Sequence, residues 1–351
     1  MSDRHHWELR GPVRSVDLQR TWRYWKSGSG ESDTCELTEN GDRSIVEFRP
    51  GGAISRRWRR NWDGSEWTTV HTYDDAGRLI GIRDESSSGQ SHFQVCEYDH
   101  TGRLKRQLSR DSNGSQRVSE SYSYDAEGRK TKMHFVDLSA QRPNTNYGWG
   151  VEGSKAFYSA PNTATLTTAY DHAGRPTTVL FHDAAGALVS QVVFLYDESG
   201  HLIEESQTHV ASPFSSFEEQ LNPAQREALR GLLTGPTSRR VHRYDALGRC
   251  AETHSSTFGR LGNHRETMDY NQHGDLIAHT SEDENRECGF DDQGHLADRP
   301  ATQHRSEARF LYEYDAAGNW TSKVTEGRHG DNQDFTVTGT ERRTLTYFDP
   351  I

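Results

Sequence analysis

Tyr98-Asp99-His100-Thr101-Gly102-Arg103 is the stretch of sequence that decides the fold, because the chain repeats its pattern. Ten units carry an aromatic residue followed four positions later by glycine, and eight of them keep the Asp after the aromatic. Clear units begin at Tyr73, Tyr98, Tyr124, Tyr170, Tyr196, Tyr244 and Tyr314, and degenerate units begin at Phe48, Tyr270 and Phe290. Most neighbouring units are 25 or 26 residues apart. Self-similarity at such a period is the signature of a repeat architecture.

Each unit predicts a β-hairpin. The stretches before the aromatic, such as 91–97 and 192–195, are rich in β-branched and aromatic residues, as strands are. The Asp can accept backbone hydrogen bonds at the turn, and the Gly supplies the positive φ that the turn needs. A second strand such as 78–82 follows, and a second turn then returns the chain. We therefore expect an all-β fold of antiparallel hairpin repeats with roughly 20 strands.

Aligning the units exposes two columns that predict the core. Residues two apart on a strand share a face, so the position two before the aromatic should pack beside the tyrosines. That column holds His71, Cys96, Tyr122, Thr168, Phe194, His242, Met268, Cys288 and Tyr312. The position two after the glycine is mostly apolar and includes Leu79, Leu202 and Cys250. Three of the four cysteines fall in these columns, which favours buried small hydrophobes over reactive thiols.

The Tyr-Asp-x-x-Gly-Arg units at Tyr73, Tyr98, Tyr124, Tyr170 and Tyr244 resemble the YD repeats, also called RHS repeats, of Rhs proteins, teneurins and insecticidal toxin-complex subunits. The resemblance covers about residues 48–320. It implies a β-ribbon that coils into a hollow shell around a toxin or other cargo. The chain has far fewer units than the large shells and no recognisable toxin domain. We therefore expect a short version, either a curled sheet, a wide barrel or a short hollow shell.

The spacing of the units suggests three regions. Residues 1–47 are expected to form Trp-rich capping strands, 48–325 the YD-repeat domain, and 326–351 a hairpin that closes the sheet. Insertions are expected near 137–162 and 208–238. The second predicts one short helix at 223–233, because Asn222 can cap it, Pro223 suits its first position and Gln225 completes a box-like pattern. This helix would either plug or cover the lumen, or lie on an apolar face of an open sheet.

Composition narrows the function classes. Leu, Ile, Val and Phe make up only 58 of 351 residues, yet aromatics reach 10% and the net charge is −11, so the chain should fold into a thin or hollow structure rather than stay disordered. No apolar run is long enough to predict a membrane span. No signal peptide is visible, which predicts a cytoplasmic protein. The overall acidity argues against binding to duplex DNA.

The candidate site residues are aromatic or titratable. Trp58 and Trp62 lie beside arginines and could bind a ligand through their ring faces, or could build an end cap of the sheet. Further candidate ligand-binding residues are Tyr147, Trp149, Tyr122 and Tyr312. Candidate acid–base residues are Glu218, Glu219, His71 and His242. The 18 histidines show no compact ligand spacing and no cofactor fingerprint is present, so neither a metal nor a cofactor is predicted.

Two functions fit these features. The favoured hypothesis is a binding scaffold that holds a partner protein or a small ligand on the concave or inner side of the β-shell. The alternative is an enzyme with acid–base, cyclase or lyase-type chemistry, acting on an apolar or sugar-like molecule in an aromatic-lined barrel cavity that the two insertions gate. The sequence leaves open whether the protein is an enzyme.

Overall fold

The computed structural model describes residues 3, 7–26, 36–110, 114–135, 163–210, 221–232, 236–257, 262–285, 288–290, 296–298, 301–330 and 334–349. Strands make up 67% of the structure, and all the pairings are antiparallel. The expected all-β fold of hairpin repeats is therefore confirmed.

The strands follow one another along the chain with few breaks. Their bounds are β1 (Val13–Lys26), β2 (Glu36–Phe48), β3 (Ile54–Arg60), β4 (Glu66–Tyr73), β5 (Leu79–Ser86), β6 (Ser91–Tyr98), β7 (Leu104–Arg110), β8 (Gln116–Tyr124), β9 (Lys130–Phe135), β10 (Thr165–Tyr170), β11 (Pro176–His182), β12 (Leu188–Tyr196), β13 (Leu202–His209), β14 (Ser238–Tyr244), β15 (Cys250–Thr257), β16 (Gly262–Tyr270), β17 (Leu276–Asn285), β18 (Cys288–Phe290), β19 (Leu296–Asp298), β20 (Thr302–Tyr314), β21 (Trp320–His329) and β22 (Thr336–Tyr347).

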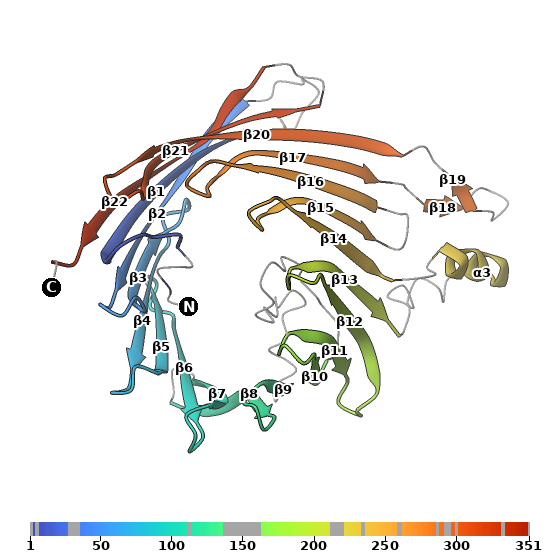
Figure 1. The fold of residues 1–351 in the computed structure, drawn as a ribbon, viewed down its shortest axis with the longest axis horizontal. Helices are drawn as coiled ribbons and strands as arrows, with labels where there is room; N and C mark the ends of the chain where they lie inside the picture. Colours follow the sequence, from blue (N-terminus) through green and yellow to red (C-terminus); the bar gives the residue numbers. More distant parts are fainter. Residues whose placement is uncertain are drawn as a thin grey trace.

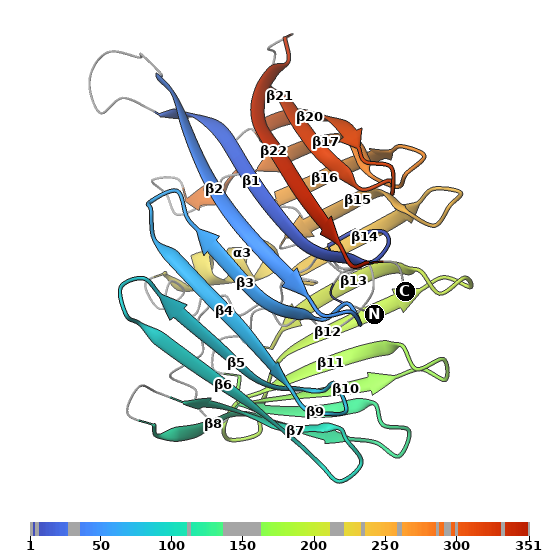
Figure 2. The same cartoon turned by 90° about the vertical axis from the view of Figure 1, so that its left-hand side faces the viewer.

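The sheet has 20 strands and closes on itself. Each strand pairs with its neighbours in the chain, except that β17 pairs directly with β20, and the last strand, β22, pairs with β1. Figure 1 shows the resulting ring of strands, and Figure 2 shows the strands inclined side by side along one wall. Of the three shapes expected from the repeats, the chain therefore adopts the closed barrel.

One unit lies outside this wall. The degenerate unit at Phe290 forms a separate two-stranded sheet, in which β18 pairs only with β19. Strands β17 and β20 pair over eight positions, from Ala278 with Arg309 to Asn285 with Thr302, which leaves no room in the wall for a strand between them. The repeat period alone did not distinguish this hairpin from those of the wall.

Each turn of the repeat is held by its own Asp and Arg. In the unit at Tyr98, Asp99 Oδ1 accepts hydrogen bonds from the backbone N–H groups of Thr101 and Arg103, at 2.9 and 3.0 Å. Asp99 Oδ2 accepts a third from Arg103 Nε at 3.1 Å. Gly102 has a φ of 83°, which only glycine adopts without strain. The hydrogen bond from the Thr101 hydroxyl and those from the Arg103 N–H groups hold the pKa of Asp99 far below its usual value.

A tyrosine ladder joins each unit to the one before it. The hydroxyl of Tyr124 donates a 2.7 Å hydrogen bond to the carbonyl of Leu104, and the Arg103 guanidinium lies 5.1 Å from the centre of the Tyr124 ring. The same hydroxyl–carbonyl pair recurs as Tyr73–Ile54, Tyr98–Leu79, Tyr170–Lys130, Tyr196–Pro176, Tyr244–Leu202 and Tyr270–Cys250. The repeated Tyr, Asp, Gly and Arg therefore form one device that fixes a turn and attaches it to its neighbour.

The expected short helix is present as α3 (Pro223–Leu232). Its first turn is closed by reciprocal hydrogen bonds, from Gln225 N–H to Asn222 Oδ1 and from Asn222 N–H to Gln225 Oε1, both 2.9 Å long. This is the capping box that the sequence predicts. The helix contacts β19, which lies outside the wall, and Figure 1 shows it beside the ring rather than within it.

The core consists of two clusters on the wall. One lies on β9–β13 and contains Phe135, Leu166, Val179, Phe181, Val192, Phe194 and Leu202. The other joins the first and last strands and contains Leu9, Val13, Val16, Leu18, Val46, Phe48 and Trp320. The second cluster buries the seam at which β1 meets β22. The division into three regions at residues 47 and 325 stays a prediction.

Candidate functional site on the inner wall of the sheet

The two faces of the wall differ in burial, which identifies the inner one. Along β12, every second side chain is buried, namely Ser190, Val192 and Phe194. Leu195, which points to the opposite face, is 49% exposed. Side chains converge on the concave side of a curved sheet and diverge on its convex side. We therefore call the face that carries the ladder tyrosines and the residues two before them the inner face.

The inner face contains two contrasting stretches on adjacent strands. The first, which we call the apolar arc, is the core cluster of β9–β13 given above. The second, which we call the polar arc, lies on β13–β17 and consists of Glu205, Arg240, His242, Thr253, His264, Glu266, His279 and Asp283. In barrels of more than about 16 strands the side chains no longer fill the interior. A polar inner wall in a sheet of 20 strands therefore faces a space that can hold water or a ligand.

Glu205 is the most deeply buried acidic group of the polar arc. It is 1% exposed, and its Oε1 lies 3.4 Å from both Arg240 Nη1 and His242 Nε2. His242 is also buried, and its Nδ1 lies 3.4 Å from Thr253 Oγ1. Burial disfavours the charged imidazole, but the hydrogen bonds and the charges of Cys250 and Glu205 together outweigh burial and raise the pKa of His242. The cluster therefore places an imidazole that favours protonation beside a buried carboxylate.

A second group of imidazoles and carboxylates follows on β16 and β17. His264 Nδ1 lies 2.6 Å from Asp283 Oδ1, and its Nε2 lies 3.5 Å from Glu266 Oε1. Glu266 Oε1 also lies 3.2 Å from His279 Nε2. Burial opposes ionisation of Glu266, but the two histidines more than compensate, so the pKa of Glu266 lies below its usual value. The polar arc is thus a strip of alternating carboxylates and imidazoles.

A pocket of about 300 Å³ opens at the polar arc. Its lining includes Glu205, Arg240, Ser255, His264 and Asp283 from the inner face. This volume is at the low end of the range for small-molecule sites. The pocket thus joins Glu205 and Arg240 of the first group to His264 and Asp283 of the second.

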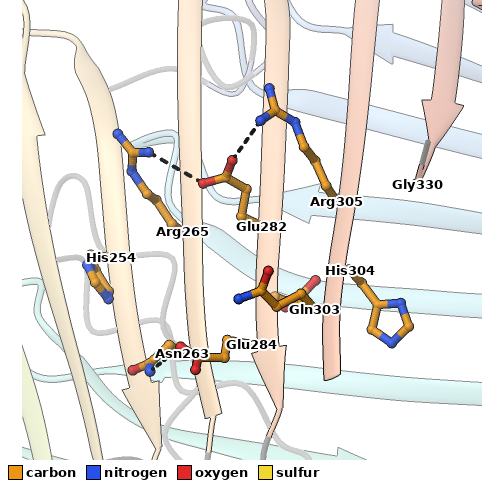
Figure 3. A pocket seen from close by; sticks show the side chains of 10 residues that line it. His254, Asn263, Arg265, Glu282, Glu284, Gln303, His304, Arg305 and Gly330 are labelled. Carbon is orange, nitrogen blue, oxygen red and sulfur yellow. Dashed lines mark hydrogen bonds and ion pairs between the residues drawn. The ribbon is translucent and has the colours of Figure 1, made fainter. Parts of the chain in front are cut away.

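A larger pocket, of about 550 Å³, is lined by charged side chains that already pair with each other. Figure 3 shows Glu282 between Arg265 and Arg305, with nitrogen–oxygen distances of 3.4 and 3.1 Å. Arg265 and Glu282 alternate in sequence with residues of the polar arc, and Arg305 pairs with Glu282, so all three project from the outer face. The pairing continues across the strands as Arg243–Glu252–Arg265–Glu282–Arg305–Glu307–Arg328, which we call the outer ion-pair ladder. Since its charges satisfy each other, we assign it to the wall and not to a site.

The two candidate histidines lie on different parts of the inner face. His242 is a central member of the polar arc. His71 lies on β4, on another part of the wall, and is half-buried. Burial lowers the pKa of His71, against the opposing charges of Asp3 and Asp84. The structure therefore does not bring the two candidate bases together.

The candidate aromatic residues are also separated. Trp58 and Trp62 line one shallow pocket of about 440 Å³ together with Arg20, Arg43 and Arg60, and Trp62 is 65% exposed. Tyr122 donates a hydrogen bond to Glu120 and lies under the ammonium group of Lys130. Tyr312 belongs to the ladder, because its hydroxyl donates to the carbonyl of Leu276 at 2.9 Å. A ligand-binding role for these four residues stays a prediction.

The remaining candidates, Tyr147, Trp149, Glu218 and Glu219, lie outside the described residues, as does the insertion near 137–162. Within the described ranges, no three His, Cys, Asp or Glu side chains are grouped as metal ligands would be. Among those same residues, no helix is long and apolar enough to cross a membrane.

The sequence did not identify most residues of the polar arc as candidate site residues. His242 stood out because it lies two positions before Tyr244, but Glu205, Glu266 and Asp283 did not. Strand parity carries the missing signal: Glu266 lies four residues before Tyr270, and so shares its face. Counting back from every ladder tyrosine in steps of two would have placed Glu266 and His264 on the inner face.

The comparisons with known proteins identify the repeat. Residues 98–137 match the family model described as RHS Repeat. The matched stretch contains the units at Tyr98 and Tyr124, and the other units repeat the same hydroxyl–carbonyl contact. This chain contains RHS-type repeats. The units outside residues 98–137 are assigned as repeats by their shared hydroxyl–carbonyl contacts as well as by their sequence pattern.

Two solved structures show how far the similarity of this RHS-repeat chain extends. A chain of the Tc holotoxin pore of Photorhabdus luminescens is 12% identical, with a TM-score of 0.37, over 90% of this chain and 18% of that chain. A porin-like protein from Bacteroides uniformis is 12% identical, with a TM-score of 0.33, over 96% and 98%. The RHS-repeat chain thus spans less than a fifth of the length of the toxin chain. A comparison with curated proteins finds no match.

Proposed function

We propose that this RHS-repeat shell is a scaffold that binds a basic polypeptide segment of a partner protein in its lumen, through the carboxylates of the polar arc. The observation that carries the proposal is the combination of a closed sheet with a charged inner wall. A wall that served stability alone would be apolar on its concave face, as it is along β9–β13. The resemblance to cargo-enclosing YD repeats also supports the binding of a partner in the lumen.

The charge of the chain favours a basic partner. The formal net charge is −11, and Glu205, Glu266 and Asp283 place three carboxylates on one side of the inner wall. Complementary charge on a partner would speed its association and fix its orientation more than it would add affinity. Because His264 and His279 lie beside these carboxylates, protonation of the imidazoles would weaken the attraction for a basic segment.

The test is the binding of a fluorescein-labelled peptide of ten arginines to the purified protein, followed by fluorescence anisotropy at low and physiological salt. The double variant Glu266→Gln/Asp283→Asn removes two inner carboxylates. The matched control is Glu252→Gln/Glu282→Gln, which removes two carboxylates of the outer ion-pair ladder and leaves the same net charge. We expect the inner variant to lose at least about tenfold in affinity, as the loss of two close charge pairs commonly does.

Equal losses in the inner and outer variants would show that the peptide binds through net charge alone, and the proposed lumen site would then be wrong. No binding of the wild-type protein at low salt would also contradict it. A peptide of ten glutamates serves as the negative control, since the acidic wall should repel it.

A further inference from the structure

Cys250 lies at the start of β15, on the inner face and next to the polar arc. Its carbonyl is a rung of the ladder, because it accepts a 2.8 Å hydrogen bond from the Tyr270 hydroxyl. Its side chain is partly exposed, whereas the thiol of Cys96 is buried. Burial raises the pKa of the Cys96 thiol, which makes Cys96 unreactive. The expectation that the repeat cysteines are buried hydrophobes therefore suits Cys96 better than Cys250.

His242 is positioned between Cys250 and Glu205. Cys250 Sγ lies 3.9 Å from His242 Nδ1, within hydrogen-bonding range for sulfur. On the other side of the ring, His242 Nε2 forms an ion pair with Glu205 Oε1 at 3.4 Å. A nucleophile, a base within reach of it and a third group that orients the base are the three parts of an activated nucleophile.

The arrangement follows from the register of three adjacent strands. Cys250 on β15 pairs with Tyr244 of β14, which brings its side chain beside that of His242 two residues earlier. Glu205 on β13 pairs with Arg240, two residues before His242. Strand pairing thus fixes the three side chains without help from any loop.

We propose that Cys250 is a nucleophilic thiol that becomes acylated by an activated acyl compound, such as a thioester or ester, entering the lumen. In the resting pair the thiol proton already lies on His242, and the Cys250 thiolate forms a bond with the carbonyl carbon. The bond between that carbon and the leaving group breaks, and the leaving group departs with the proton from His242. Glu205 is a positioning residue, since it holds the imidazole and balances its charge. This inference is independent of the proposed binding of a partner.

The first test is the pH profile of alkylation by iodoacetamide in the intact protein, measured for each cysteine by peptide mass spectrometry. An ordinary thiol has a pKa of about 8.5, so its rate falls about tenfold per pH unit below that value. We expect the Cys250 rate to change less than about threefold between pH 6 and pH 8. The shape of the profile is independent of how easily the reagent reaches the thiol. Glutathione is the reference in the same buffers.

Other titratable groups lie on the inner face of the strands around Cys250, and they bear on the profile. They are Glu205 on β13, Arg240 and Tyr244 on β14, and Glu266 and Tyr270 on β16. The carboxylates oppose a thiolate, whereas Arg240 favours it. We expect the imidazole of His242 to have the largest effect on the stability of the thiolate.

The second test separates His242 and Glu205 from their neighbours. The variants His242→Gln and Glu205→Gln are expected to restore the steep profile of glutathione and to lower the rate at pH 7 by about tenfold. The matched controls are His254→Gln and Glu204→Gln, which remove a histidine and a carboxylate from the outer face of the same strands. Both controls should leave the profile flat. Circular dichroism checks that each variant is folded.

A third measurement addresses the acyl step directly. The wild-type protein is incubated with a small acetyl thioester, and we expect one acetyl group on the peptide that contains Cys250 and none on that of Cys96. A wild-type alkylation profile as steep as that of glutathione would overturn the proposal. This result does not depend on whether the His242→Gln and Glu205→Gln variants fold. Acetylation of both cysteines, or of neither, would overturn it as well.

Discussion

The apolar arc and the polar arc are built from the same hairpin unit, yet their inner faces have opposite character. In both arcs a tyrosine hydroxyl attaches each unit to the previous one, as Tyr196 does in the apolar arc and Tyr270 in the polar arc. Between these tyrosines, the apolar arc places residues such as Phe194, whereas the polar arc places His242 in the same column. The repeated frame is thus constant, and the side chains between its rungs are free to differ.

This difference separates two tasks within one wall. The turns and the ladder supply the geometry everywhere, so the apolar arc can supply packing and the polar arc can supply chemistry. On the outer side of the polar arc, the outer ion-pair ladder crosses six strands, from Arg243 on β14 to Arg328 on β21. Exposed pairs of this kind contribute little energy each, but alternating charges on adjacent strands favour one register over its alternatives.

The largest expected effect comes from breaking the apolar arc. Phe194→Ala should lower the free energy of unfolding by about 3–5 kcal/mol, because it removes a buried ring and leaves a cavity. The control is Leu195→Ala, whose side chain points outward and is 49% exposed, with an expected loss under about 1 kcal/mol. Urea denaturation followed by tryptophan fluorescence measures both. Similar losses in the two variants would mean that packing does not distinguish the two faces of β12.

The repeat pattern was sufficient to predict the hairpins, because each turn is decided by residues close in sequence. The Asp and Gly of a unit act within five residues, as Asp99 and Gly102 show. The short helix could be predicted for the same reason, since Asn222 and Gln225 cap it locally. Closure of the sheet could not be predicted, because it depends on the pairing of β1 with β22, more than 300 residues apart.

The role of the repeated Arg and the partners of the site residues could not be predicted from the sequence for a related reason. Arg103 stacks on Tyr124 of the following unit, and this contact appears only once the units are in register. Likewise Glu205 meets His242 only through the pairing of β13 with β14 across an insertion. Sequence columns therefore marked single residues of the polar arc but not their partners.

A middle-sized effect should be shared by both arcs, because it concerns the constant frame. Tyr196→Phe and Tyr270→Phe each remove one hydroxyl that donates to a backbone carbonyl. Each should lower the free energy of unfolding by about 0.5–1.5 kcal/mol, the usual net value of one hydrogen bond. Urea denaturation again provides the measurement. If only the variant in the apolar arc lost stability, the ladder would not be a common frame.

The smallest effect is the most specific, because two inner-face histidines should respond to pH in opposite directions. His209, which pairs with Ser190 at the margin of the apolar arc, has its pKa lowered by burial. The unfolded chain then binds the proton more readily, so stability falls as the pH drops below about 6.5. His242 has a raised pKa, because the hydrogen bonds and the charges of Cys250 and Glu205 together outweigh the cost of burial. Its contribution is complete below about pH 6.5 and is lost as the pH rises through its folded pKa.

Urea denaturation of the wild-type protein, His209→Gln and His242→Gln at half-unit steps from pH 5.5 to 8.5 separates the two contributions. His209→Gln should reduce the loss of stability on the acid side, and His242→Gln should reduce the loss on the alkaline side. The outer-face variant His254→Gln should leave both limbs unchanged. A His242→Gln variant with the alkaline limb of the wild-type protein would show that Glu205 does not stabilise a charged imidazole in the folded state. The polar arc would then differ from the apolar arc in composition but not in electrostatics.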